Sequence, residues 1–223
     1  FTFIKYQKNR NLFDWLKIAP GLLLSGGLEL IANKLRFRRN CKKYPNYLPN
    51  QMKSVKKARD FKQKEFVPFF KTYIGYKALC EGSKEYDAVF VGSDQTWRPF
   101  GFYSNYWNLM FVDDNVPKFS YAASYGVSKI PAIQKKGTKR YLERLDMISV
   151  REQKGKEIVD SLSAKKAEVV ADPTMLLSNA QWKEFADKAT VDLPKEKYIF
   201  CYFLGTRQDI REEAEKIAED TGL

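Results

Sequence analysis

One short segment constrains the fold of this chain more than any other: an apolar run that stops at small polar residues. Residues 88–91, Ala-Val-Phe-Val, are followed by Gly-Ser-Asp at 92–94. A buried strand ends in this way when small polar groups are needed at its carboxyl end. Further along, the small-residue strand 119–123 runs into Ser-Tyr-Gly at 124–126, which leaves room for a ligand to approach. We therefore expect two neighbouring strands whose ends face one cleft.

Strands and helices alternate regularly after residue 86. The patterns predict strands at 86–91, 118–123, 147–150 and 168–171, and helices at 131–145, 152–162 and 178–189. The last helix is expected to open with a capping box formed by Ser178 and Gln181. Alternation of this kind indicates a mostly parallel sheet. The sequence therefore predicts an α/β fold, a Rossmann-like parallel sheet with flanking helices, over residues 81–189.

Two further regions flank this expected core. Residues 1–80 are expected to form a basic helical segment attached to the first domain, with one helix near 52–66. Residues 190–197 are interpreted as a linker. Beyond it, residues 198–223 are expected to begin a second α/β domain with a strand at 198–204, a turn at 205–206 and a helix at 208–220. We therefore expect the chain to be a fragment of a longer protein.

The residues that follow the four expected strands are small or charged. In open parallel sheets ligands bind beyond the carboxyl ends of the strands, because loop amides and helix amino termini converge there. Each position also has a structural explanation, since the glycines can serve tight turns and the aspartates can cap them. Four such sites at one edge favour a binding site, and its candidate residues are Gly92, Ser93, Asp94, Gln95, Trp97, Ser124, Tyr125, Arg151, Glu152 and Asp172.

The positive charge lies in the first third of the chain. Of the formal net charge of +12, residues 1–79 contribute 18 Lys and Arg against 4 Asp and Glu. Such a segment suits phospholipid headgroups, or is simply a solvated basic face. The apolar stretch 18–31 is too short and too interrupted to span a bilayer, so residues 1–43 either lie in a membrane interface or pack on the body of the protein. No nucleic-acid-binding signature accompanies the basic residues, so no nucleic-acid partner is expected.

Residue types that are absent or rare exclude several kinds of chemistry. Histidine is missing, which removes Ser-His triads and most zinc sites, so acid-base work falls to Asp, Glu, Lys or Tyr. The three cysteines are scattered and form no Cys-x-x-Cys pair, which fits a reducing cytoplasm. No cluster of carboxylates has the spacing of a metal site, so neither a metal nor a cofactor is expected.

Four motifs in order resemble the polysaccharide pyruvyl transferase family. They are Tyr86 to Trp97 (YDAVFVGSDQTW), Ser120 to Gly126 (SYAASYG), Ile148 to Glu152 (ISVRE) and Val170 to Thr174 (VADPT), within a similarity that spans about residues 86–204. The resemblance implies a fold like the GT-B glycosyltransferases, with phosphoenolpyruvate as donor. It further implies a sugar of a cell-surface glycan, or of its lipid-linked precursor, as acceptor at the cytoplasmic face of the membrane. The product would be a pyruvyl ketal, with phosphate released.

The chemistry of ketal formation suggests roles for individual residues. Arg151, between a strand and a helix start, suits an anionic donor, or else pairs with Glu152 or Asp172 and only fixes the turn. Asp94 suits orientation or deprotonation of an acceptor hydroxyl. Trp97 is interpreted either as a sugar contact, together with Ser93 and Gln95, or as part of the core. Ser124 and Tyr125 are expected to hydrogen-bond either the donor or the acceptor, and both possibilities stay open.

Two alternatives to the pyruvyl transferase remain open at the level of sequence. The first is a GT-B-type glycosyltransferase that uses a nucleotide-sugar on the same architecture. The second is a non-catalytic module that has kept the fold and binds glycan precursors. An Arg- and His-containing motif in the second domain is associated in the family with the donor, and these 223 residues do not contain it. Its presence in the intact protein would support pyruvyl transfer, and its absence would support the binding module.

Overall fold

The computed structural model describes residues 2–7, 27–45, 47–99, 105–188, 195–203 and 208–222. The chain forms two compact units, Phe1–Leu176 and Leu177–Leu223. The expected linker at 190–197 lies partly outside the described residues, and the expected domain boundaries remain predictions. Much of the apolar stretch 18–31 also lies outside them.

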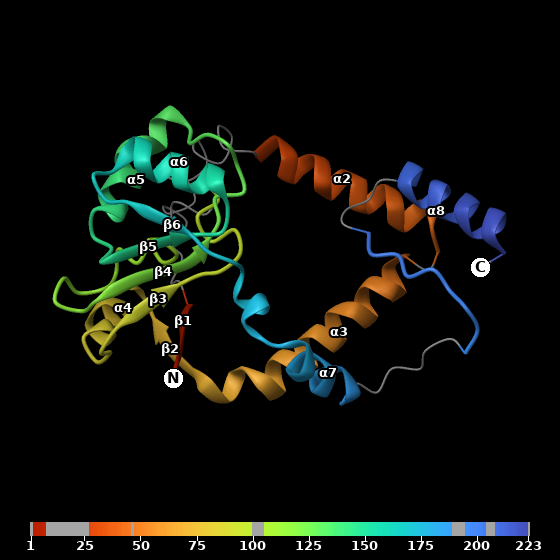
Figure 1. Ribbon diagram of the computed structural model, residues 1–223, viewed down its shortest axis with the longest axis horizontal. Helices are drawn as coiled ribbons and strands as arrows, with labels where there is room; N and C mark the ends of the chain where they lie inside the picture. Colours follow the sequence, from red (N-terminus) through yellow and green to blue (C-terminus); the bar gives the residue numbers. More distant parts are fainter. Residues whose placement is uncertain are drawn as a thin grey trace. The chain divides into compact units, whose positions relative to one another are not determined.

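The first unit contains a four-stranded sheet with all strands parallel (Figure 1). Its strands are β3 (Val89–Val91), β4 (Lys118–Ala123), β5 (Met147–Val150) and β6 (Ala167–Val169), and they lie side by side in the order of the sequence. The connections from β4 to β5 and from β5 to β6 contain α5 (Ala132–Leu142) and α6 (Gln153–Leu162). Parallel neighbours need such helical crossovers, which explains the alternation seen in the sequence.

One face of this sheet is buried beneath apolar side chains. Ile148 and Val150 alternate with the less buried Met147 and Ser149 along β5, as expected when one face meets helices. Tyr141 and Leu142 of α5, together with Val159 of α6, belong to the same buried core. This packing fixes β4, β5 and their helices as one body, so the loops that follow the strands start from rigid positions.

The fold class predicted from the sequence is confirmed, with small differences in the bounds of elements. The expected strands 118–123 and 147–150 have the same bounds in the structure, whereas β3 begins three residues later than expected and β6 covers Ala167–Val169. Helix α7 (Asn179–Asp187) begins after Ser178, and its predicted capping box with Gln181 is formed. The likeness to GT-B enzymes remains a prediction.

The amino-terminal region is not purely helical, contrary to expectation. It contains α2 (Gly27–Lys43), α3 (Tyr47–Glu65), the 3₁₀ turn η1 (Val67–Phe69) and α4 (Tyr76–Ser83), but also two strands. Strand β1 (Phe3–Gln7) pairs in parallel with β2 (Phe70–Ile74). Neither strand was predicted from the sequence, because runs of five residues carry little period-2 pattern.

The second unit contains α7 and α8 (Gln208–Thr221), so the helix expected at 208–220 is confirmed. The strand expected at 198–204 is not formed over the described residues 198–203. Phe200 and Tyr202 are 80% and 77% exposed there. An apolar run becomes a strand only when a neighbouring strand completes its hydrogen bonds, and among the described residues none pairs with this run. The expected turn at 205–206 lies outside the described residues.

Candidate functional site

The residues after β3 form a tight turn with special backbone geometry. Gly92 has φ +139, and a Cβ at this position would lie 1.9 Å from the carbonyl oxygen of Tyr121 on β4. Glycine is therefore required by both its conformation and the close approach of the neighbouring strand. Asp94 adopts a left-handed conformation with φ 60, and its side chain is 87% exposed. The turn thus presents a carboxylate to solvent.

Backbone hydrogen bonds fasten this turn to the end of β4. The Ser124 amide donates to the Asp94 carbonyl over 2.9 Å, and the Trp97 amide donates to the Ser124 carbonyl over 3.1 Å. Gln95 lies over the following loop, since a Cβ on Gly126 would be 2.6 Å from its Cδ. The expected adjacency of the turns after β3 and β4 is therefore real.

The end of β4 is in turn bonded to the residue that opens α6. The buried Ser124 hydroxyl donates to Oε1 of Glu152 over 2.8 Å, and the Tyr125 amide donates to the same oxygen over 3.3 Å. Glu152 occupies the N-cap position of α6, although its side chain does not cap that helix. Its carboxylate instead ties β4 to the start of the helix that follows β5.

Arg151 is surrounded by carboxylates from three different strand ends. Its Nη1 donates to Oδ2 of Asp172 over 3.2 Å. Nη2 lies 3.7 Å from Oδ1 of Asp94, and Nε lies 3.9 Å from Oε2 of Glu152. The Arg151 side chain is half-buried, so its positive charge is partly screened from water and acts mainly on these neighbours. One guanidinium among three carboxylates gives the cluster an excess of negative charge.

Asp172 is the most constrained carboxylate of this cluster. Besides Arg151, the Ser93 hydroxyl donates to its Oδ2 over 2.7 Å. The amide and hydroxyl of Thr174 donate to its Oδ1 over 3.1 and 2.9 Å. The Thr174 amide, followed by the Ser93 and Thr174 hydroxyls, lowers the pKa of Asp172 well below the usual range, because these donors favour the charged carboxylate. Asp172 is therefore an anion that holds its neighbours in place.

These contacts join the carboxyl ends of all four strands, as the sequence analysis expected. Ser93 and Asp94 come from the end of β3, Ser124 from β4, Arg151 from β5 and Asp172 from β6. Each expected position follows its strand on the same edge of the sheet. Arg151 is ion-paired, with Asp172 as its nearest partner, and its role as a contact for the donor stays a prediction.

Two of the candidate residues are buried beneath the cluster rather than on its surface. Trp97 is 5% exposed, and its ring lies 5.3 Å from those of both Tyr125 and Tyr141. Its Nε1 donates to the Trp107 carbonyl. Tyr125 is fully buried, accepts a hydrogen bond from the Tyr141 hydroxyl, and burial raises the pKa of its own hydroxyl. The structure thus favours the core interpretation of Trp97.

One participant in the cluster was missed in the sequence. Thr174 completes the hydrogen bonds of Asp172, and the pattern Asp-x-Thr is typical of an Asx-type turn in which an aspartate accepts from the backbone two residues later. From the sequence, Asp172 was interpreted as a cap for its turn, without Thr174 as a partner. The Asp-x-Thr pattern at 172–174 is visible in the sequence and could have indicated it.

Within the described parts of the chain, no group of three His, Cys, Asp or Glu side chains has a geometry that could hold a metal ion. That the protein needs neither a metal nor a cofactor stays a prediction. Nor does any helix in those parts have both the length and the apolar character needed to cross a bilayer.

Comparison with known proteins gives one match. A family model described as polysaccharide pyruvyl transferase matches residues 25–223. No curated protein and no solved structure matches the chain. The matched range includes the whole four-stranded sheet and every residue of the cluster at its edge.

Proposed function

Because the chain belongs to the polysaccharide pyruvyl transferase family, whose members are transferases, we propose that it uses phosphoenolpyruvate as donor. The acceptor in this proposal is a sugar of a cell-surface glycan or of its lipid-linked precursor. The reaction needs no further cofactor. The observation that supports a site in this chain is the series of contacts from Ser93 to Asp172 to Arg151 to Asp94, which joins three strand ends.

The proposed reaction forms a ketal from two sugar hydroxyls. Both hydroxyl oxygens bond to C2 of the enolpyruvyl group, and the bond between C2 and the phosphate oxygen breaks. One hydroxyl proton ends on C3, which becomes a methyl group, and the other leaves with the phosphate. The protein must therefore hold two anionic groups of the donor, relieve a hydroxyl of its proton and tolerate positive charge at C2.

Arg151 is the proposed contact for a donor anion. A guanidinium binds a carboxylate or phosphate in a fixed, two-pronged geometry. Asp94 is its most exposed partner and lies at 3.7 Å, beyond hydrogen-bonding distance, whereas Asp172 is bonded to Nη1 at 3.2 Å. In the proposal the donor takes the place of Asp94 at Nη2 while Asp172 keeps holding Nη1. The displaced Asp94 carboxylate is then available to accept the proton of an acceptor hydroxyl.

The remaining residues of the cluster are proposed to bind or support the acceptor. Carboxylates and hydroxyls are suited to sugar hydroxyls, which both donate and accept hydrogen bonds. Ser93, Gln95 and Glu152 are partly or fully exposed and provide such groups. Substrate-binding roles that remain proposals are those of Gly92, Ser93, Gln95, Trp97, Ser124, Tyr125, Glu152 and Asp172. Of these, the buried Trp97 and Tyr125 would support the residues above them without touching the substrate.

The proposed setting is the cytoplasmic face of the membrane, in an architecture like that of GT-B enzymes. Cys41, Cys80 and Cys201 are free thiols, as is usual in a reducing compartment. The parallel sheet with its site at the carboxyl ends of the strands agrees with such an architecture. Neither observation depends on the identity of the donor.

Calorimetric titration of phosphoenolpyruvate into the intact protein tests this function. Binding should weaken by about 1.5–3 kcal/mol in Arg151→Ala, the usual contribution of a hydrogen bond to a charged group. Arg140→Ala, which removes an exposed arginine from α5, is the matched control and should bind as the unmodified protein does. Binding of a nucleotide-sugar instead would identify a glycosyltransferase. Binding of neither donor, with retained binding of the glycan, would identify a non-catalytic module.

A further inference from the structure

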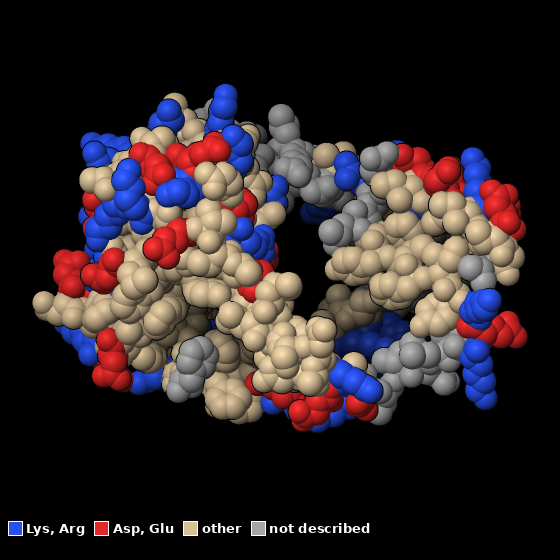
Figure 2. All heavy atoms as spheres, in the orientation of Figure 1, with Lys and Arg blue, Asp and Glu red and all other residues tan. Residues whose placement is uncertain are grey.

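Helices α2 and α3 have a large excess of Lys and Arg over Asp and Glu. Together the range 27–65 contains 12 Lys and Arg against 3 Asp and Glu, in a chain whose formal net charge is +12. All six cations of α3 are exposed: Lys53, Lys56, Lys57, Arg59, Lys62 and Lys64. On α6, by contrast, Lys residues are mixed with Asp and Glu (Figure 2). The shorter helix α5 is also basic, with four Lys and Arg and no Asp or Glu.

An exposed apolar stripe runs along α3 among these cations. Leu48, Met52 and Val55 are 44%, 65% and 53% exposed. Their spacing of four and then three residues places them on one face of the helix. Lys53, Lys56 and Arg59 recur every three residues and form a row beside that stripe. A helix of a soluble protein normally buries such a stripe.

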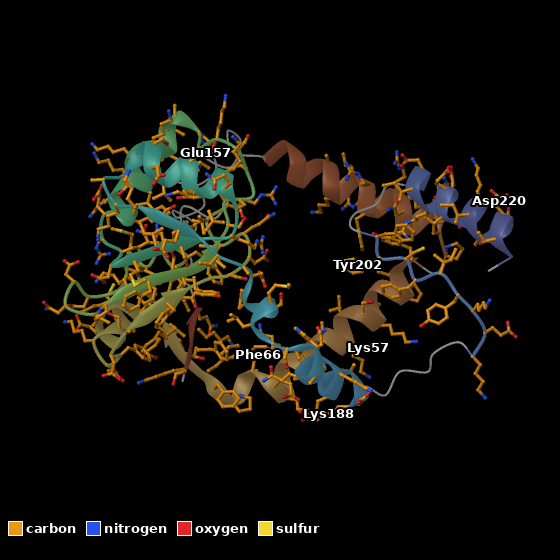
Figure 3. All side chains as sticks on the ribbon, viewed as in Figure 1. Lys57, Phe66, Glu157, Lys188, Tyr202 and Asp220 are labelled. Carbon is orange, nitrogen blue, oxygen red and sulfur yellow. The ribbon has the colours of Figure 1, made fainter. Side chains whose placement is uncertain are left out.

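Contacts at both ends fix the orientation of α3. At its amino end the Tyr47 ring lies 5.8 Å from Phe37 of α2, edge to face. Phe66, labelled in Figure 3, directly follows the carboxyl end of α3. Its ring lies 5.5 Å from that of Phe3 of β1 and 5.8 Å from that of Phe61. These contacts use Tyr47, Phe61 and Phe66, so they leave the stripe of Leu48, Met52 and Val55 uncovered.

We propose that this face of α3 docks on the surface of an anionic lipid bilayer. Exposed cations beside exposed aliphatic side chains are the combination that binds a membrane interface, where apolar groups enter the headgroup region and cations remain at the lipid phosphates. The lysine stems add apolar length while their amines reach the headgroups. The complementary charge of the bilayer identifies it as the partner. This inference does not depend on the proposed reaction.

The apolar stripe also distinguishes a bilayer from nucleic acid. Binding to a nucleic-acid backbone needs cations and, for single strands, aromatic rings on which bases stack. Leu48, Met52 and Val55 provide neither. Exposed aliphatic side chains contribute binding free energy only when their partner has an apolar layer.

Cosedimentation of the intact protein with vesicles tests the proposal. The probes are phosphatidylcholine vesicles with and without phosphatidylglycerol. Binding is expected only with the anionic lipid and should fall as salt rises, because exposed charges are screened. Replacing Lys53, Lys56 and Arg59 with Gln should lower the partition coefficient about a hundredfold, at roughly fivefold for each cation. The matched control variant replaces two lysines and one arginine of α5 with Gln: Lys136, Lys139 and Arg140. It should bind the vesicles nearly as well as the unmodified protein.

A second measurement reports the apolar contact without relying on loss of binding. Tryptophan emission of Met52→Trp, taken as the difference from the unmodified protein, should shift to the blue when anionic vesicles are added. Ile133→Trp places the same reporter on α5, where Ile133 is 73% exposed, and should not shift. Equal loss of binding in both triple variants, absence of vesicle binding, or a shift at residue 133 alone would overturn the proposal. Tighter binding of a short single-stranded RNA, lost with the α3 cations, would replace lipid with nucleic acid.

Discussion

The Ser93 hydroxyl donates a 2.7 Å hydrogen bond to Oδ2 of Asp172, a residue 79 positions later in the chain. This bond joins the loops after β3 and β6, the two outer strands of the four-stranded sheet. Arg151, at the end of β5, donates to the same oxygen. Asp172 is therefore held by side chains from two other strand ends, which makes it a support for Arg151 rather than a free proton acceptor.

Replacing Asp172 with Asn should change the acid sensitivity of the protein. The pKa of Asp172 is lowered in the folded state, so its carboxylate stabilises the fold above the pKa of an unfolded aspartate, about 4, and this contribution is lost as the pH falls towards the lower folded value. Urea denaturation midpoints of both proteins should be measured from pH 7 downwards. At pH 7 the midpoint of Asp172→Asn should be lower than that of the unmodified protein. The difference from the unmodified protein should narrow below about pH 4. A difference that stays constant with pH would contradict this account.

Gly92→Ala should destabilise the first unit strongly. An added Cβ would lie 1.9 Å from the Tyr121 carbonyl oxygen, and φ +139 is itself unfavourable for alanine. We expect a loss of at least about 3 kcal/mol in the free energy of unfolding, measured by urea denaturation. Gly75→Ala is the control, because Gly75 has φ +84 but no atom within 4 Å of its added Cβ. Its cost should be about 1–3 kcal/mol, from conformation alone. Equal losses of unfolding free energy in Gly92→Ala and Gly75→Ala would show that the close approach to Tyr121 does not contribute to the cost.

The part of the fold that could be predicted from the sequence is the part with strong local signals. Strands such as 118–123 and 147–150 are apolar, and each is followed by small or charged residues and then by a helix. Because all strands of the sheet are parallel, knowing where they end was sufficient to predict that Asp94, Arg151 and Asp172 lie close together. The distances and the direction of each hydrogen bond needed the structure.

The parts that could not be predicted depend on partners distant in the sequence. Strands β1 and β2 pair across more than sixty residues, Phe3 opposite Phe70, and neither has a pattern that specifies its partner. The run from Tyr198 to Phe203 has strong strand propensity, yet it forms no strand, and no strand among the described residues pairs with it. Burial of Trp97 was likewise undecided, because an indole suits a core and a sugar contact equally well.

Trp97→Phe separates the two roles of that residue. The substitution removes the hydrogen bond from Nε1 to the Trp107 carbonyl and reduces packing against Tyr125 and Tyr141. The free energy of unfolding should fall by about 1–3 kcal/mol, while KM for the acceptor stays unchanged. Trp182→Phe on α7, where the tryptophan is 43% exposed, should cost less than about 1 kcal/mol. A raised KM with unchanged stability would restore Trp97 as a sugar contact.

Asp94→Asn tests the assignment of the proton acceptor. Asp94 is 87% exposed and lies 3.7 Å from Arg151, whereas Asp172 accepts from Ser93, Arg151 and Thr174 and has little capacity for another proton. An amide of the same shape cannot accept the proton of a hydroxyl, so kcat should fall by about 10²–10⁴ with little change in KM for phosphoenolpyruvate. The control is Asp87→Asn. Asp87 is an exposed aspartate before β3, so this substitution makes the same change in charge at the other end of that strand and should leave kcat unaltered.

If Asp94→Asn keeps full activity while Arg151→Ala loses donor binding, the cluster binds the donor but the base lies elsewhere. If Asp94→Asn instead raises KM for the donor, the carboxylate positions Arg151, and the proposed displacement of Asp94 by the donor is wrong.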